Sequence, residues 1–263
     1  MVRTAIPANA PPQTLYLVGD RIKSQIPHPR LLSISELEVL IENGRAGGTL
    51  SSVLRLRIGQ GAAADRLREM KQRIESYGLG NWIRMPGEHE LERASGAYTH
   101  KRQPRNIMIS EPQQGADAEY VATLLADDSC AEMSDHLSGK HIQGMVLIEA
   151  ARQMVLAVGE KFFISAAHRG QRSFVTHHIE AQFHDFVLPL EVEMKCRIDS
   201  VRRGADSNFK ARAAITFHQA GALSASMRFV FSVLDKGFLQ SQETRLLERQ
   251  IPESEGSQLS CTL

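Results

Sequence analysis

The segment from Asp135 to Gln153 holds the residue types best suited to chemistry. Glu149, Arg152 and Gln153 stand three and four residues apart, so on a helix they share one face. A carboxylate is costly to bury on an otherwise apolar helix, and that cost raises its pKa toward the range of a general acid or base. The same spacing also fits an internal ion pair between Glu149 and Arg152. Both interpretations stay open.

Two histidines, His136 and His141, precede this helix in the loop that enters it. The helix N-terminus at Gly144 and Met145 offers free backbone N–H groups, which stabilise the oxyanion formed when a thioester carbonyl is attacked. Gly144 has no side chain to hinder the approach of that carbonyl. We therefore take Glu149, His141 and His136 as the catalytic candidates. The alternative is that the loop histidines are solvated or structural.

The helix that positions these groups is apolar on nearly every side, which predicts that protein surrounds it. Around it, the hydrophobic pattern predicts two preceding strand regions and four following strands, at 97–110, 119–127, 173–183, 190–201, 208–217 and 222–233. A strongly curved antiparallel sheet wrapped around one central helix, the hotdog fold, satisfies this α+β pattern. A helix lying on a flat sheet is the simpler alternative.

The N-terminal third predicts a different unit. Residues 1–13 are proline-rich and read as a disordered lead-in. Residues 14–95 predict a small α/β unit of unknown role, with a capping box at Ser33 and Glu36. Residues 96–236 form the expected hotdog domain. A C-terminal tail is expected over residues 237–263, with a short helix at 246–251.

No cofactor or metal site is expected. The turn Gly59-Gln-Gly-Ala-Ala-Ala64 has the spacing of a dinucleotide fingerprint. The strand before it alternates arginine with apolar residues, however, whereas the strands of nucleotide-binding parallel sheets are buried on both faces. His177, His178 and His184 lack a supporting cluster of cysteine or aspartate, so zinc is not expected.

Composition narrows the classes of partner. The chain has 263 residues with 31 basic and 30 acidic side chains, a balance that argues against nucleic-acid binding. Charged residues interrupt the most apolar stretch, residues 142–163, which argues against a membrane span. The three cysteines, Cys130, Cys196 and Cys261, have no paired spacing. Together with the absence of a signal peptide they predict reduced thiols in a cytoplasmic protein.

The segment His141-Ile-Gln-Gly-Met-Val-Leu-Ile-Glu-Ala-Ala-Arg-Gln153 resembles the helix motif of the A-factor biosynthesis (AfsA) hotdog family. His100-Lys101-Arg102, followed by Asn106-Ile-Met-Ile-Ser, is similar to the family's HKR segment. Phe183-x-x-Phe186-x-Leu-Pro-Leu-Glu191 resembles a turn that hotdog proteins share. The likeness covers about residues 97–235. Two departures are Gln143, where the family pattern has proline, and residues 1–95, which lack a second copy of the motifs.

The resemblance implies an acyltransferase. It would move a β-ketoacyl group from an acyl carrier protein or coenzyme A thioester to a small phosphorylated acceptor such as dihydroxyacetone phosphate, in γ-butyrolactone signal or secondary-metabolite synthesis. A hotdog dehydratase or thioesterase, and a non-catalytic acyl-binding protein, remain alternatives. The expected substrate-binding residues are Gly144, Met145, Arg152, Gln153, His100, Lys101 and Arg102. Because a lone hotdog leaves a sheet edge free, we also expect a homodimer.

Overall fold

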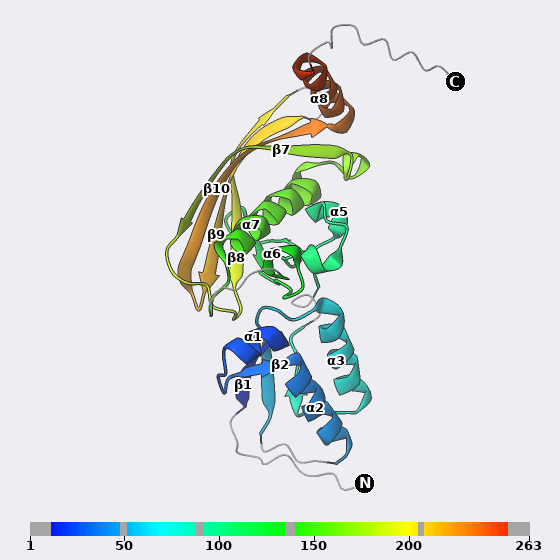
Figure 1. Cartoon of the computed structure of the whole chain (residues 1–263), viewed down its shortest axis with the longest axis vertical. Coiled ribbons are helices and arrows are strands. Elements are labelled where there is room, and N and C mark those ends of the chain that lie inside the picture. The colour runs from blue at the N-terminus through cyan, green and yellow to red at the C-terminus, as the bar shows by residue number, and fades with distance from the viewer. Residues whose placement is uncertain (1–11, 48–51, 88–91, 135–139, 205–207, 252–263) are drawn as a thin grey trace, which may run out of the picture.

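A computed structural model describes residues 12–47, 52–87, 92–134, 140–204 and 208–251. Figure 1 shows two units, a smaller one near the N-terminus and a larger one from which the last helix projects. Their buried apolar side chains form separate clusters. None of the helices in the described ranges is both long and apolar enough to cross a membrane.

The smaller unit is a parallel sheet with helices between its strands. The strand order is β2-β1-β3-β4, and every pair is parallel. The capping box predicted at Ser33 is present at the start of the second helix. Its elements are β1 (Gln13–Val18), α1 (Asp20–Gln25), β2 (Leu31–Ser33), α2 (Ile34–Arg45), β3 (Leu54–Ile58), α3 (Ala64–Ser76) and β4 (Ile83–Arg84).

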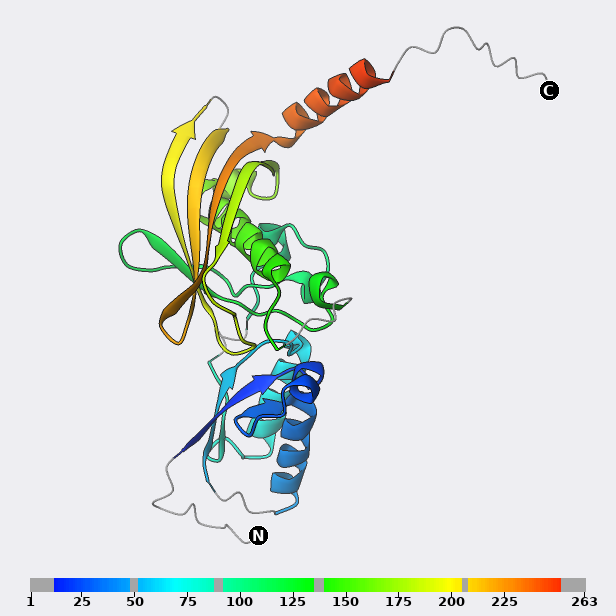
Figure 2. The same ribbon diagram turned by 60° about the vertical axis from the view of Figure 1, so that its left-hand side comes forward.

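The larger unit is one curved antiparallel sheet in the order β5-β6-β8-β9-β10-β7. Its strands are β5 (Gln113–Gln114), β6 (Glu119–Thr123), β7 (Arg172–Phe183), β8 (Glu193–Arg203), β9 (Phe209–Gln219) and β10 (Ala222–Asp235). Figure 2 shows this sheet bending around the long helix α7 (Gly144–Val158). The predicted α+β hotdog fold is therefore confirmed.

The apolar side chains of α7 are buried, because the sheet and the chain segments that precede α7 cover most of the helix surface. Val146, Ala150, Met154 and Val158 are essentially inaccessible to solvent. The helix ends in a π-helical turn, Gly159–Phe163. One stripe, which includes Met145, Ile148, Glu149 and Arg152, remains exposed or partly exposed. The helix is thus enclosed on most sides, as its sequence predicted, but not on all of them.

The prediction of a strand over residues 97–110 is wrong. This stretch contains a short helix α5 (Gly96–Thr99) and a 3₁₀ turn (Pro104–Asn106), and only isolated bridges join it to strands. Ser95 caps α5 by accepting a hydrogen bond from the Ala97 N–H. Residues 106–108 are held by hydrogen bonds with α7, which are described below.

The C-terminal helix is also longer than predicted. Helix α8 (Lys236–Gln250) starts directly after β10, where the Asp235 side chain accepts a hydrogen bond from the Phe238 N–H. A shorter helix confined to 246–251 was expected, because no apolar periodicity marks its first turns. Since no residue of α8 is buried, its sequence lacks the apolar periodicity of a helix that packs one face on a core.

The glycine-rich turn at 59–64 joins the two units. Gln60 is fully buried, and its side chain bonds to backbone groups of Leu124, Leu190 and Ala126 in the hotdog unit at 2.9–3.0 Å. The turn therefore serves packing between the units.

Candidate functional site

Glu149 lies at the centre of a charged network on α7. Arg152 binds it with two hydrogen bonds, Nε to Oε2 at 2.7 Å and Nη2 to Oε1 at 2.8 Å. Lys101 Nζ lies 2.8 Å from Oε1, and the Gln153 amide donates to the same oxygen at 3.0 Å. The structure thus brings together the two segments that resemble the A-factor family. Lys101 lies in one of them and Glu149 in the other, and the two residues are far apart in the chain but adjacent in space.

Gln153 fixes this network to the segment that precedes the sheet. It is fully buried, and its Oε1 accepts a hydrogen bond from the Met108 N–H at 2.9 Å. Its Nε2 donates to the Asn106 carbonyl at 2.8 Å. Because both ends of the amide are satisfied by backbone, Gln153 is a structural clamp between α7 and residues 106–108. The sequence predicted a substrate-binding role for Gln153, and no local pattern indicates this contact with residues 106–108.

The expectation that burial raises the pKa of Glu149 is wrong. Burial alone does act in that direction, but hydrogen bonds from Arg152, Lys101 and Gln153 outweigh it and lower the pKa to about 2. The same ion pair raises the pKa of Arg152. Glu149 is therefore ionised at neutral pH and has no proton to give as a general acid.

A second buried carboxylate, Glu160, lies in the π-helical turn and pairs with His100. The distance from His100 Nε2 to Glu160 Oε1 is 2.9 Å, and the Gly170 N–H donates to Oε2 at 3.0 Å. The Glu160 side chain has no exposed surface, whereas 31% of the His100 side chain is exposed. The His100 ring also meets Phe174 edge-on at 5.5 Å. In the sequence Glu160 is one of the charged residues that interrupt the apolar stretch 142–163, and its pairing with His100 has no local sequence signal.

The N-terminus of α7 is open on one side and covered on the other. A Cβ on Gly144 would lie 2.8 Å from the Phe183 ring, so the ring occupies the space that a side chain would need. The Phe183 ring therefore hinders the approach of a substrate carbonyl to Gly144 from this side. Met145 is 64% exposed, so access to the first turn is from its side. The Gln143 side chain makes no capping hydrogen bond.

His141 lies just before this helix and faces the smaller unit. Its ring packs against that of Phe186, with centroids 4.8 Å apart. It lines a cavity of about 40 Å³ together with Gln143, Asp128 and Arg21 of α1. Burial and the neighbouring Asp127 raise the pKa of Asp128. His136, the other histidine candidate, falls outside the described residues.

A larger apolar cavity adjoins the His141 cavity. It measures about 410 Å³, which lies within the usual range for small-molecule sites. The two cavities share Ile26 and Pro189 in their linings. Lys140 and Arg30 supply positive charge among the residues that line the larger one. The remaining lining residues, mostly apolar, are Tyr16, His28, Leu31, Leu188 and Leu190.

The structure therefore divides the predicted site residues into two groups. Glu149, Arg152, Gln153 and Lys101 form one network. His141 instead lines the small cavity next to α1, and Gly144 and Met145 follow it at the start of α7. In the described part of the chain, no hydrogen bond or ion pair joins His141 to Glu149. Arg102 is exposed beside Lys101. Within the described ranges no cluster of three or more histidine, cysteine, aspartate or glutamate residues could hold a metal ion.

The A-factor biosynthesis hotdog domain model matches residues 86–235. No curated protein matches the chain. A mutant thioesterase from Pseudomonas aeruginosa is 14% identical and aligns over 48% of this chain and 81% of its own, with a TM-score of 0.37. A thioesterase from Haemophilus influenzae is 14% identical over 49% and 80%, with a TM-score of 0.38. A hot-dog-like protein from Thermanaerovibrio acidaminovorans is 15% identical over 43% and 74%, with a TM-score of 0.34.

Proposed function

The chain belongs to the A-factor biosynthesis hotdog family, and we propose that it is an acyltransferase. Membership of this family fits a protein that acts on acyl thioesters. The enzyme moves a β-ketoacyl group from an acyl carrier protein or coenzyme A thioester to a small phosphorylated hydroxyl compound such as dihydroxyacetone phosphate. The observation that carries the proposal is the apolar cavity of about 410 Å³, which shares Ile26 and Pro189 with the smaller cavity that His141 and Gln143 line. It offers room for an acyl chain, and the His141 ring lines the smaller cavity that adjoins it.

In the proposed reaction the acyl chain lies in the apolar cavity and its thioester carbonyl meets the first turn of α7. The N–H groups near Gly144 and Met145 stabilise the oxyanion. His141 takes the proton of the attacking hydroxyl as the new C–O bond forms. The tetrahedral intermediate then collapses, the C–S bond breaks, and the proton on His141 passes to the departing thiolate. No covalent acyl-enzyme is required.

Glu149 acts in this scheme as a positioning residue. Its low pKa keeps it negative, and its ion pairs hold Lys101 and Arg152 on the partly exposed stripe of α7. Arg152 retains 34% of its side-chain surface exposed, so a phosphate can approach it. We propose Arg152, Lys101 and Arg102 as the cations that meet the acceptor phosphate, with Lys140 beside the apolar cavity as a further candidate.

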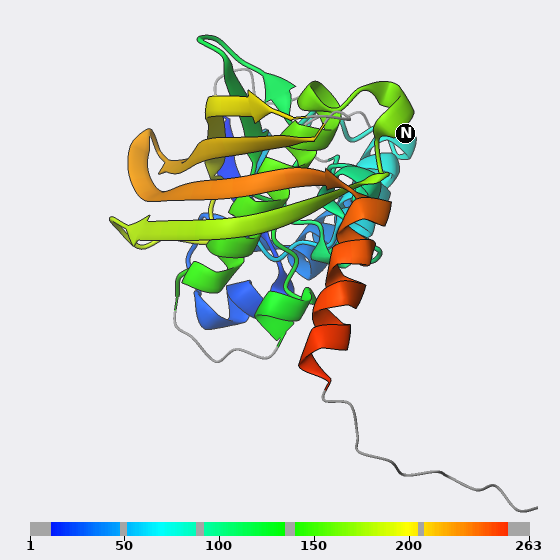
Figure 3. The ribbon, with the colours of Figure 1, turned by 90° about the horizontal axis from the view of Figure 1, so that it is seen from above.

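The proposal includes pairing of two copies through β7. This strand is at the edge of the sheet and pairs on one side only, with β10 (Figure 3). Ile179, Phe183 and Phe186 expose large apolar surfaces on or just beyond it. An open edge of this kind invites pairing with another strand. We expect a dimer mass in sedimentation at micromolar concentration, and a monomer there would contradict this part of the proposal.

The identity of the product tests the reaction. The chain is incubated with β-ketoacyl carrier protein, with and without dihydroxyacetone phosphate, and the products are identified by mass spectrometry. An ester of dihydroxyacetone phosphate, formed only when the acceptor is present, supports the acyltransferase. Free β-keto acid formed without the acceptor would show a thioesterase, and a 2-enoyl product from a 3-hydroxyacyl substrate would show a dehydratase. Either result, or no turnover of any substrate, would overturn the proposal.

A further inference from the structure

The two faces of the smaller unit's parallel sheet are covered unequally. Helices α2 and α3 pack on one face, where Leu15, Leu56 and Ile58 are buried. Residues on the opposite face of β3 and β4 are exposed, as the alternating burial of β3 shows. Parallel sheets are ordinarily covered on both faces. The uncovered part of this face is therefore unusual for its class.

Three arginines, Arg55, Arg57 and Arg84, stand on this uncovered part. Arg55 of β3 and Arg84 of β4 are register partners on neighbouring strands, and Arg57 follows Arg55 on the same face. Like charges directly opposite one another on a sheet are destabilising. Arg57 is neutralised by an ion pair with Glu191 of the hotdog unit. Arg55 and Arg84 have no carboxylate partner in the described part of the chain.

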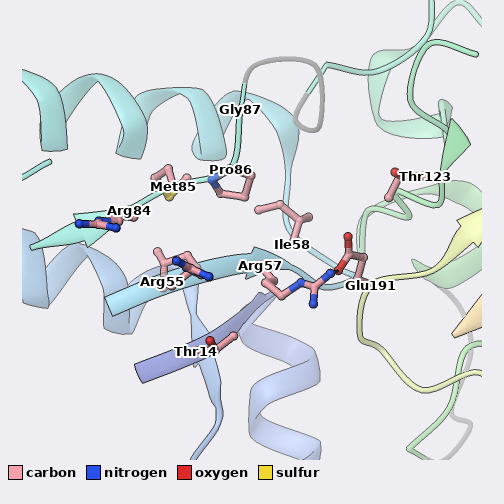
Figure 4. A pocket seen from close by; sticks show the side chains of 11 residues that line it. Thr14, Arg55, Arg57, Ile58, Arg84, Met85, Pro86, Gly87, Thr123 and Glu191 are labelled. Carbon is pink, nitrogen blue, oxygen red and sulfur yellow. Dashed lines mark ion pairs between the residues drawn. The ribbon is translucent and has the colours of Figure 1, made fainter. Parts of the chain in front are cut away.

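These arginines line a cavity of about 390 Å³ between the two units (Figure 4). In the figure Arg57 reaches toward Glu191, while Arg55 and Arg84 extend from adjacent strands. The Thr14 hydroxyl adds a neutral donor, and Thr123 comes from the hotdog unit. The remaining lining residues are Leu56, Ile58, Met85, Pro86 and Gly87.

We propose that this cavity binds the phosphate group of a small molecule. Two guanidinium groups without acidic partners can each present a fork of N–H donors to phosphate oxygens, and a bound dianion removes their mutual repulsion. The concave shape and the volume fit a small ligand better than the surface of an acidic protein. The inference goes beyond the acyl transfer proposed above, because neither His141 nor the apolar cavity contributes to this site.

The test is calorimetric titration of the full chain with inorganic pyrophosphate at constant ionic strength. We expect saturable binding that weakens roughly 10-fold in Arg55→Gln and in Arg84→Gln, and by about 100-fold when both are changed. The matched control is Arg212→Gln, because Arg212 is also an exposed strand arginine without an ion pair in the described residues. Circular dichroism of each variant verifies folding. All three residues are surface positions, so the four variants should fold.

Further titrations identify what carries the phosphate. Coenzyme A and dihydroxyacetone phosphate are compared with pyrophosphate, and tighter binding of either one, lost in the double variant, supports the proposal and names the ligand. Carrier protein without its phosphopantetheine group contains no phosphate. If it binds in an Arg55- and Arg84-dependent manner while the three phosphate compounds do not, the site is a protein-docking surface and the proposal is overturned. Absence of binding by all three phosphate compounds, or equal weakening by Arg212→Gln, also overturns it.

Discussion

The Glu149 network and the entrance around His141 lie on and just before the same helix but use their polar groups differently. Both oxygens of Glu149 are occupied by side chains from α7 and from the segment at Lys101. His141 has a ring contact with Phe186 and faces a cavity. The paired charges around Glu149 stabilise the folded chain, whereas the His141 ring, which faces a cavity, is accessible to a substrate. We therefore expect substitutions in the network to affect stability and substitutions at the entrance to affect chemistry.

The largest effect is expected for His141→Asn. If His141 is the base, turnover of the β-ketoacyl thioester falls by roughly 10²–10⁴-fold, the usual range for losing a general base. The free energy of unfolding should change by less than about 1 kcal/mol, because the ring is only partly buried. The measurements are steady-state kinetics and urea denaturation. His168→Asn, in the 3₁₀ turn Ala166–His168 and also partly buried, is the control; equal activity in both variants would refute the assignment of His141.

The opposite response is expected for Glu149→Gln. Removing one member of a largely buried ion-pair network should lower the free energy of unfolding by about 2–3 kcal/mol. Turnover per folded molecule should fall by less than about tenfold, because Glu149 positions cations and transfers no proton. Glu180→Gln removes an exposed partner of Arg228 and should cost under about 1 kcal/mol. Unchanged stability with a loss of turnover above about 10²-fold would make Glu149 catalytic.

The pH dependence of stability sharpens the same contrast. The pKa of Glu149 is about 2 in the folded chain against an ordinary value of 4.5, so the folded state favours the ionised form. The resulting stabilisation is complete above pH 4.5 and is lost as the pH falls through about 2. The difference in unfolding free energy between the wild type and Glu149→Gln should therefore shrink over that interval. Denaturation curves at several pH values test this, and a constant difference would exclude an ion-pair origin.

The smallest effect is expected for Gly144→Ala at the entrance. The new Cβ would lie 2.8 Å from the Phe183 ring, which must move, at a cost of about 1–2 kcal/mol. Because Phe183 is 52% exposed, its ring has room to turn. Thermal unfolding measures the change, and Phe183→Leu in the same chain should relieve it. Gly80→Ala, where no atom lies within 4 Å, is the control. A loss that Phe183→Leu leaves unrelieved would show that the ring is not its cause.

Local signals in the sequence were sufficient for most of the regular elements. The alternating strands from β7 to β10, the apolar α7 and the capping box at Ser33 all carry patterns with a single physical interpretation. The stretch 97–110 was misassigned because its apolar residues are buried by contacts with a distant helix rather than by strand pairing. Helix α8 was underestimated because nothing buries one of its faces.

The sequence by itself determined the hotdog fold, the family and the residue types at the candidate site, since these follow from periodicity and from motifs contained in short segments. Only the tertiary structure decided how those residues are used. It joined Glu149 to Lys101 and His100 to Glu160, and it placed His141 in the lining of a cavity between the two units. The physical reason is that the pKa and availability of a charged group depend on its neighbours in space. The sequence around Glu149 shows its partner at Arg152 but not the ammonium group of Lys101.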